Sequence, residues 1–178
     1  VFDCYRPQQA VRALVAWAKR PQGPAFGTHN PRVARNMLIA SGYISTVSHH
    51  ARGIAVDLTL VQRPPAPQST VEQQRSGPCT APITERQPDG GLDMGTSFDC
   101  FDPASAPRSR HVGPDQRANR KLLADAMAAR GFRGLATEWW HFTYRNAPSS
   151  AGPRDSRKRV NARARGVDCC RWWVRKFS

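Results

Sequence analysis

The 178-residue sequence predicts an α+β fold, in which helices flank a small antiparallel or mixed sheet. Amphipathic helical patterns occur in two distant parts of the chain, near residues 5–19 and 116–130. Two short apolar segments, residues 54–60 and 135–144, are rich in β-branched or aromatic residues, as strands are. There is no internal repeat, and residues 1–146 are predicted to form one domain.

The first helix is predicted over residues 5–19, where Pro7 is tolerated in the first turn. Its apolar face has small and aliphatic residues at helical spacing: Ala10, Val11, Leu14, Val15 and Ala18. A second helix is predicted from Asn30 and Pro31, as cap and first position, to a stop at Gly42. The third, over residues 116–130, is expected to bury Leu122, Leu123, Ala126 and Met127 before Gly131.

The first predicted strand, Ile54 to Leu60, contains a carboxylate. Burial of an unpaired Asp57 in such a strand would be costly, and binding a metal ion is one way to keep it there. His50 and His141 complete a set of three ligands, the number that a catalytic zinc site usually takes from the protein. Glu138, three residues before His141, is close enough to handle a proton, so the pattern indicates metal-assisted hydrolysis.

The alternatives are structural. A lone histidine near a glycine turn is usually a surface or core residue, and residues 139–144 also fit an aromatic core strand. Side chains three apart on a regular strand point to opposite faces, so Glu138 and His141 could not both face a metal. We therefore expect either a bulge or a strand that begins only after Glu138.

The pattern Ser48-x-His50-x-x-Gly53-x-Ala55-x-Asp57, followed by Glu138-Trp139-Trp140-His141, resembles the VanX-type D-alanyl-D-alanine dipeptidases, zinc enzymes related to D,D-carboxypeptidases. Three further segments extend the resemblance, which covers roughly residues 1–146: Tyr5-Arg6-Pro7, Met94 to Asp99, and Asn119-Arg120. The His/Asp motif is shared with the carboxypeptidases, whereas the double tryptophan and the segment ending at Asp99 point more narrowly to the dipeptidases.

The resemblance implies a role for each site residue. One Zn²⁺ would be held by His50, Asp57 and His141, with Glu138 as catalytic base and Arg6 facing the oxyanion of the scissile carbonyl. Asp99 would bind the free amino group of a small dipeptide, with Ser48 as a nearby polar contact. The alternatives are a D,D-carboxypeptidase or endopeptidase of longer cell-wall peptides, and an inactive metal-binding remnant.

The proline-rich connection 62–91 is predicted to be a flap over the substrate or a disordered excursion. A Cys79–Cys100 bridge would fasten it near Asp99, but reduced thiols and other partners remain alternatives for the five cysteines. Such a bridge would favour a periplasmic or exported enzyme over a cytoplasmic one. No apolar segment reaches the ~20 residues that span a bilayer.

Both ends depart from the resemblance. About 60 residues of the family's N-terminal part are expected to be missing before Val1. Residues 147–178 form a basic tail, predicted to be disordered or a non-native extension such as a frameshifted reading; residues 151–178 carry +7 of the net +14. A basic tail with aromatic residues could bind nucleic acid, but we disfavour that partner. The sequence predicts no oligomeric state.

Overall fold

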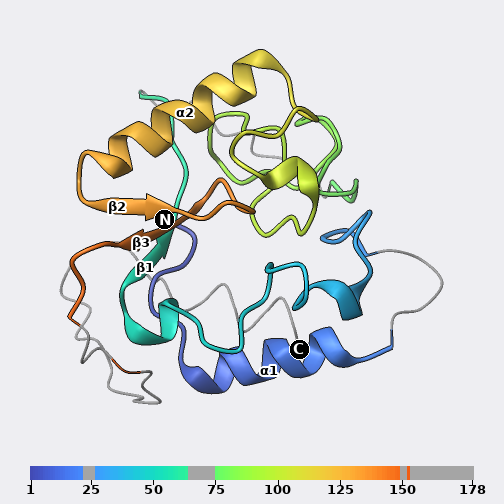
Figure 1. Ribbon diagram of the computed structural model, residues 1–178. Helices are drawn as coiled ribbons and strands as arrows, with labels where there is room; N and C mark the ends of the chain where they lie inside the picture. The colour runs from blue at the N-terminus through green and yellow to red at the C-terminus, as the bar shows by residue number, and fades with distance from the viewer. Residues whose placement is uncertain (22–26, 64–74, 149–151, 153–178) are drawn as a thin grey trace.

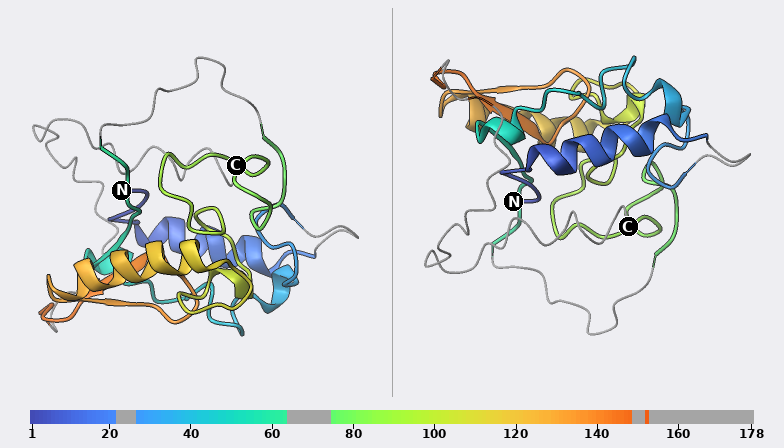
Figure 2. Two further views of the ribbon diagram at one scale, coloured as in Figure 1. Left: turned by 90° about the horizontal axis from the view of Figure 1, so that it is seen from above. Right: turned by 90° about the horizontal axis from the view of Figure 1, so that it is seen from below.

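The computed structural model describes residues 1–21, 27–63, 75–148 and 152. Its helices are α1 (Gln8–Lys19) and α2 (Pro114–Ala128), and its strands are β1 (Ala55–Asp57), β2 (Phe132–Gly134) and β3 (His141–Tyr144). The two helices lie on opposite sides of the sheet (Figure 1), and the long loops between residues 75 and 113 extend beside them (Figure 2). The predicted α+β class is confirmed.

The sheet is antiparallel, with strand order β1-β3-β2. Its register places Asp57 opposite His141 and Ala55 opposite Thr143. The N-terminal segment runs beside the free edge of β1, where Asp3 and Asp57 form an isolated antiparallel bridge. The central strand β3 therefore lies beside the strand that carries Asp57.

The strands are shorter than predicted. Only residues 55–57 of the segment 54–60 form a strand, and residues 135–140 turn before β3 starts at His141. The predicted strand start after Glu138 is therefore the irregularity that occurs. The prediction missed β2, a three-residue strand that follows the turn at Gly131 (φ 82°), because so short a segment has no readable alternation.

The first predicted helix is confirmed as α1. It buries Val11, Leu14 and Ala18 on one face, and Pro7 lies at the position before the first turn. The second prediction was wrong, because residues 30–42 contain one 3₁₀ turn, Arg35–Met37, and no α-helix.

Local hydrogen bonds explain this error. The buried Asn30 side chain donates to the Val33 carbonyl at 2.9 Å, which makes a turn where a helix cap was expected. The Leu38 carbonyl accepts from the backbone N–H groups of Tyr43 and Ile44. These bonds allow Leu38 and Ile44 to pack with Leu14 and Ala18 of α1, so tertiary packing overrides helix propensity.

The third predicted helix exists as α2, but its buried face differs from the prediction. Leu123 is buried and Met127 half-buried, whereas Leu122 is 57% exposed and Ala126 is also exposed. Arg120 takes the expected apolar place, because its guanidinium donates to the carbonyls of Met94, Ala104 and Ala106 at 2.7–2.8 Å. Burial, and then the positive charge of Arg86, lower the Arg120 pKa to about 10.

Two hydrophobic clusters form the core. One lies between α2, the sheet and the loop after residue 93, and consists of Cys79, Met94, Phe98, Cys100, Leu123, Trp139, Trp140 and Phe142. The other packs on α1 and consists of Leu14, Ala18, Leu38, Ile44 and Phe101. Cys79 and Cys100 form a disulfide, one of the pairings left open by the sequence. Residues 94–106, which we call the clamped loop, thus contribute to both clusters.

The connection 62–91 is described only in part, since residues 64–74 lie outside the described residues. The part from residue 75 onward packs on the domain: Cys79 N–H donates to the Thr28 carbonyl, and the buried Arg86 forms an ion pair with Asp93 at 2.5 Å. The predicted basic tail also lies outside the described residues, apart from 147–148 and Gly152. Within the described ranges, neither helix has the length and hydropathy needed to cross a membrane.

Candidate functional site

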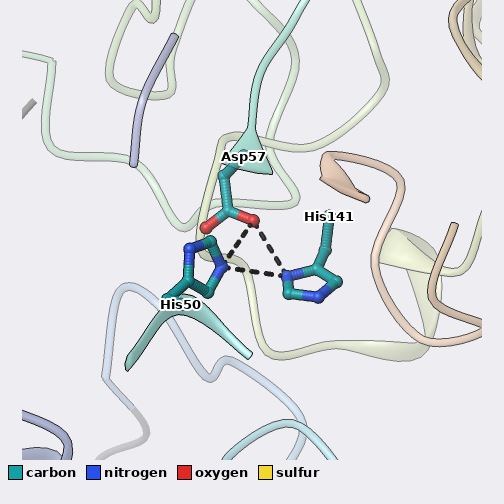
Figure 3. A group of neighbouring side chains, drawn as sticks. All are labelled: His50, Asp57 and His141. Carbon is teal, nitrogen blue, oxygen red and sulfur yellow. Dashed lines mark hydrogen bonds and ion pairs between the residues drawn. The ribbon is translucent and has the colours of Figure 1, made fainter. Parts of the chain in front are cut away.

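His50, Asp57 and His141 converge on one point (Figure 3). Asp57 Oδ1 lies 3.2 Å from His50 Nε2 and 3.0 Å from His141 Nδ1, and the two nitrogens are 3.1 Å apart. His141 is 84 residues from Asp57 in the sequence, but the three ligand atoms form a nearly equilateral triangle. This is the arrangement expected of a site that holds one metal ion.

The backbone explains the convergence. Asp57 and His141 face each other across the β1–β3 register, so their side chains lie on the same face of the sheet. His50 begins the 3₁₀ turn His50–Arg52, which ends at Gly53 with φ 70°. This left-handed conformation favours glycine and turns the chain directly into β1. Asp57 follows His50 by seven positions, and the turn brings their side chains together.

Hydrogen bonds to the far nitrogens fix which ring atom of each histidine faces the centre. His50 Nδ1 lies 2.7 Å from the Cys4 carbonyl, which can only accept, so the proton is on Nδ1 and Nε2 presents a lone pair. His141 Nε2 lies 3.3 Å from Thr143 Oγ1, which leaves Nδ1 for the centre. Both rings thus have the outer hydrogen bond that metal-binding histidines usually make.

The charges also fit a cation. Burial would raise the pKa of Asp57, but the charge and hydrogen bonds of His50 and His141 outweigh it and hold that pKa well below its usual range. Burial would lower the pKa of His50, but the Asp57 carboxylate reverses this and raises it. A metal ion at the centre would be attracted by the Asp57 carboxylate and would satisfy the same three ligand atoms.

Glu138 lines the same pocket and lies just before β3, where the chain is not in a strand. The carboxyl group is buried, with 7% of the residue exposed. Burial, and then the negative charges of Asp57 and Asp99, raise its pKa well above the usual value. A carboxyl group with a raised pKa beside a candidate metal site is a candidate for proton transfer.

Arg6 also faces the site. Its Nη2 lies 3.7 Å from Asp57 Oδ2 and 2.7 Å from Asp3 Oδ2, and its Nε donates to the same Asp3 oxygen at 2.9 Å. Asp3 is 1% exposed and its other oxygen accepts the Cys4 N–H at 2.8 Å. This buried carboxylate therefore holds the Arg6 guanidinium at the pocket wall.

The pocket encloses about 220 Å³. Asp99 and Ser48 both line it and are largely buried; Asp99 has a left-handed φ of 57°, and the Ser48 hydroxyl accepts the His50 N–H at 3.2 Å. All seven residues singled out in the sequence thus border one cavity. Its remaining wall is mostly apolar and includes Leu14, Ile44, Val47, Phe101 and Leu135.

Three neighbours of the site were missed in the sequence. Tyr43 lines the pocket, and burial raises its pKa to about 12, so its hydroxyl stays protonated. Asp3 precedes Arg6 by three residues, and Thr143 follows His141 by two, which on a strand means the same face. The last two spacings could have been read from the sequence, whereas nothing near Tyr43 distinguishes it.

Comparisons with known proteins point to one family. A model of peptidase family M15, described as D-ala-D-ala dipeptidase, matches residues 65–160. This segment contains Asp99, Glu138 and His141, while His50 and Asp57 lie before it.

Curated relatives extend the match toward the N-terminus. A D-alanyl-D-alanine dipeptidase of Streptomyces coelicolor is 34% identical over 149 residues, which are 83% of this chain and 62% of the relative. Proteins of the same name from Enterococcus faecium and Escherichia coli are 29% and 31% identical over 150 residues each. The matches cover 62% of the Enterococcus faecium protein and 56% of the Escherichia coli protein. The chain therefore spans about three fifths of the relatives' length. Because the family model matches more than half of its residues, the chain belongs to the peptidase M15 family of D-ala-D-ala dipeptidases.

Proposed function

We propose that this chain is a zinc dipeptidase that hydrolyses D-alanyl-D-alanine or a similar small dipeptide, in the metabolism of peptidoglycan. The observation that carries the proposal is the meeting of His50 Nε2, Asp57 Oδ1 and His141 Nδ1 at one end of a pocket that also contains Glu138 and Arg6. The substrate is proposed from the relatives, which are D-alanyl-D-alanine dipeptidases.

The donor set supports zinc. Nitrogen and oxygen ligands at ~2.0–2.2 Å from a tetrahedral Zn²⁺ lie about 3.3–3.6 Å apart. The observed separations of 3.0, 3.1 and 3.2 Å need to open by only a few tenths of an ångström. Three protein ligands leave a fourth position for water, as in catalytic zinc sites. A zinc ion bound here would supply Lewis acidity to a water molecule and to the scissile carbonyl.

Glu138 would accept a proton from the attacking water and donate it to the departing amine. In the metal-loaded site this carboxyl group would ionise more readily, because a cation offsets the charges of Asp57 and Asp99 that raise its pKa. Arg6, held by Asp3, would stabilise the oxyanion that develops on the carbonyl. Proton transfer and charge stabilisation would thus come from different sides of the site.

The pocket supports a small substrate with a free amino group. Its volume of about 220 Å³ is below the ~300–1,000 Å³ typical of sites for larger ligands. Asp99, buried in the pocket wall, would bind the ammonium group, and Ser48 would offer a polar contact. The disulfide supports an oxidising location, periplasmic or outside the cell, as part of this proposal.

The decisive experiment combines metal analysis with hydrolysis of free D-alanyl-D-alanine by the 178-residue chain. We expect about one zinc per chain and release of D-alanine. Glu138→Gln should retain zinc and lose ~10²–10⁴ of the rate, whereas the exposed control Glu85→Gln should not change it. Equal turnover by Glu138→Gln and the unmodified chain would exclude Glu138 as the base.

Two rival functions predict different results. Hydrolysis of a pentapeptide ending in D-alanyl-D-alanine, without hydrolysis of the free dipeptide, would replace this proposal with a D,D-carboxypeptidase or endopeptidase. Bound zinc without turnover of either substrate would indicate an inactive metal-binding remnant.

A further inference from the structure

Two adjacent histidines contact alternate residues of β3. His50 Nε2 lies 3.1 Å from His141 Nδ1, and His49 Nδ1 lies 3.0 Å from Thr143 Oγ1. His141 and Thr143 are two apart on the same strand, so both side chains are on the face that meets the turn carrying the two histidines. The second contact, between His49 and Thr143, has no role in the function proposed above.

The two contacts are joined through the His141 ring. When a metal ion binds the Nδ1 lone pair, the ring proton is on Nε2, which lies 3.3 Å from Thr143 Oγ1 and would donate to it. A threonine hydroxyl can accept this bond and still donate its own proton. The neighbouring acceptor for that proton is His49 Nδ1. The result is a directed series of hydrogen bonds that starts at the candidate metal ligand and ends at His49.

We propose that Thr143 and His49 are positioning residues of the metal site, which fix the tautomer and ring orientation of His141. The proposal rests on the metal site of the proposed function. The His50 ring is oriented by a hydrogen bond to the backbone carbonyl of Cys4, which no side-chain substitution removes. His141 depends on the Thr143 hydroxyl, so its orientation can be changed by mutation without altering a ligand.

The test measures zinc affinity of the full chain by competition with a chromophoric chelator. Thr143→Val keeps the shape of the side chain and removes the hydroxyl, and we expect about 10- to 100-fold weaker binding, the usual effect of losing such an outer hydrogen bond. Thr143→Ser retains the hydroxyl and should bind like the unmodified chain. His49→Ala should weaken binding less than Thr143→Val, and the exposed control His111→Ala should leave it unchanged.

A spectroscopic measurement distinguishes positioning from general stability. In the zinc-loaded chain, ¹⁵N NMR of the imidazoles should show His141 protonated at Nε2, and Thr143→Val should broaden or shift this signal while that of His50 is retained. Melting of the metal-free variants checks that they fold. If Thr143→Val fails to fold, His49→Ala and Thr143→Ser still decide the question.

Zinc affinity of Thr143→Val equal to that of the unmodified chain would overturn the proposal. So would a Thr143→Ser variant as weak as Thr143→Val, because the hydroxyl would then be irrelevant. These outcomes are separate from failure of the proposed function: a chain that binds zinc with the expected pattern but hydrolyses no dipeptide supports the positioning role alone. A chain that binds no zinc at all overturns both.

Discussion

The two walls of the pocket are built in different ways. The sheet wall presents Asp57 and His141 from paired strands, with His50 on the turn before β1, so backbone register brings the groups together. The opposite wall presents Asp99 and Phe101 from the clamped loop, residues 94–106, which has no strand. A disulfide at Cys100 and the guanidinium of Arg120 hold this loop.

Because of this difference, the two walls should contribute differently to metal binding and to folding stability. A strand pair satisfies its own backbone groups, whereas a buried irregular loop needs partners from elsewhere. Arg120 donates to three of the loop carbonyls, and Trp139 donates its indole N–H to Thr96 Oγ1 at 2.9 Å. We therefore expect substitutions in the sheet wall to change metal binding, and substitutions that release the clamped loop to change stability first.

The largest expected effect is on the sheet wall. Asp57→Asn keeps the side-chain shape but removes the charge that contacts both imidazoles. It should reduce zinc affinity by more than the ~10- to 100-fold expected for an outer hydrogen bond, and abolish measurable dipeptide hydrolysis. Chelator competition and the D-alanine assay measure the two effects. The matched control is Asp125→Asn, which alters an exposed carboxylate on α2. Retention of full zinc affinity by Asp57→Asn would refute its role as ligand.

The next effect concerns the clamped loop. Arg120→Met fills much of the same space but leaves two buried carbonyls and one partly buried carbonyl without their donor. At about 1–3 kcal/mol for each lost partner, the free energy of unfolding should fall by at least ~3 kcal/mol. Urea unfolding of the metal-free chain measures this loss. Lys121→Met, next along α2, removes only an exposed ion pair and should change stability by less than ~1 kcal/mol. Similar midpoints for the two variants would contradict the clamping role of Arg120.

Removal of the disulfide should have a comparable or smaller effect. Cys79 and Cys100 are 21 residues apart, and closing a loop of this size restricts the unfolded chain by about 3 kcal/mol. The double variant Cys79→Ser/Cys100→Ser should lose about that much in urea unfolding, while its zinc affinity stays near that of the unmodified chain. Loss of zinc binding in a folded double variant would show that the two walls are not independent.

The smallest expected effect is on the pH dependence of stability and concerns Glu138. This residue lies near a negative charge from each wall, Asp57 and Asp99. Its folded-state pKa is raised by burial, Asp57 and Asp99, so the metal-free folded state holds a proton that the unfolded state releases above ~4.3. The stability of the metal-free chain should therefore fall as pH rises from that value toward the raised pKa. Glu138→Gln should remove this decline and unfold at higher denaturant than the unmodified chain at pH 7. Identical pH profiles would contradict the raised pKa.

Part of the sheet wall could be predicted from local sequence, whereas His141 was assigned to it through the motif Glu138-Trp139-Trp140-His141. His50 and Asp57 lie within one turn-strand segment, and an aspartate in an apolar strand indicates a specific partner. The strand start after Glu138 also followed from side-chain alternation. Two predictions failed where distant contacts decide the structure, namely the helix over residues 30–42 and the burial of Leu122. The strand β2 was not predicted, because three residues are too few to show a pattern.

Arg120 shows why those contacts are hard to predict. A charged residue in an amphipathic helix is normally assigned to the exposed face. Its burial depends on carbonyl groups 14 to 26 residues earlier in the chain, which periodicity does not report. The role of the Thr143 hydroxyl is also hard to predict. The sequence shows that Thr143 is two residues from His141, but only the orientation of the His141 ring shows that the two side chains contact each other.

The β1–β3 register also defines where the chain tolerates change in length. Asp57 and His141 are 84 residues apart, and their meeting depends on three cross-strand pairs rather than on the length of what intervenes. Extra residues inserted between 62 and 91 would leave this pairing intact. One residue inserted into β3 would rotate every following side chain to the other face. Insertions should therefore be tolerated better in the connection 62–91, where they leave the Cys79–Cys100 disulfide and the Arg86–Asp93 ion pair in place, than in the short strands.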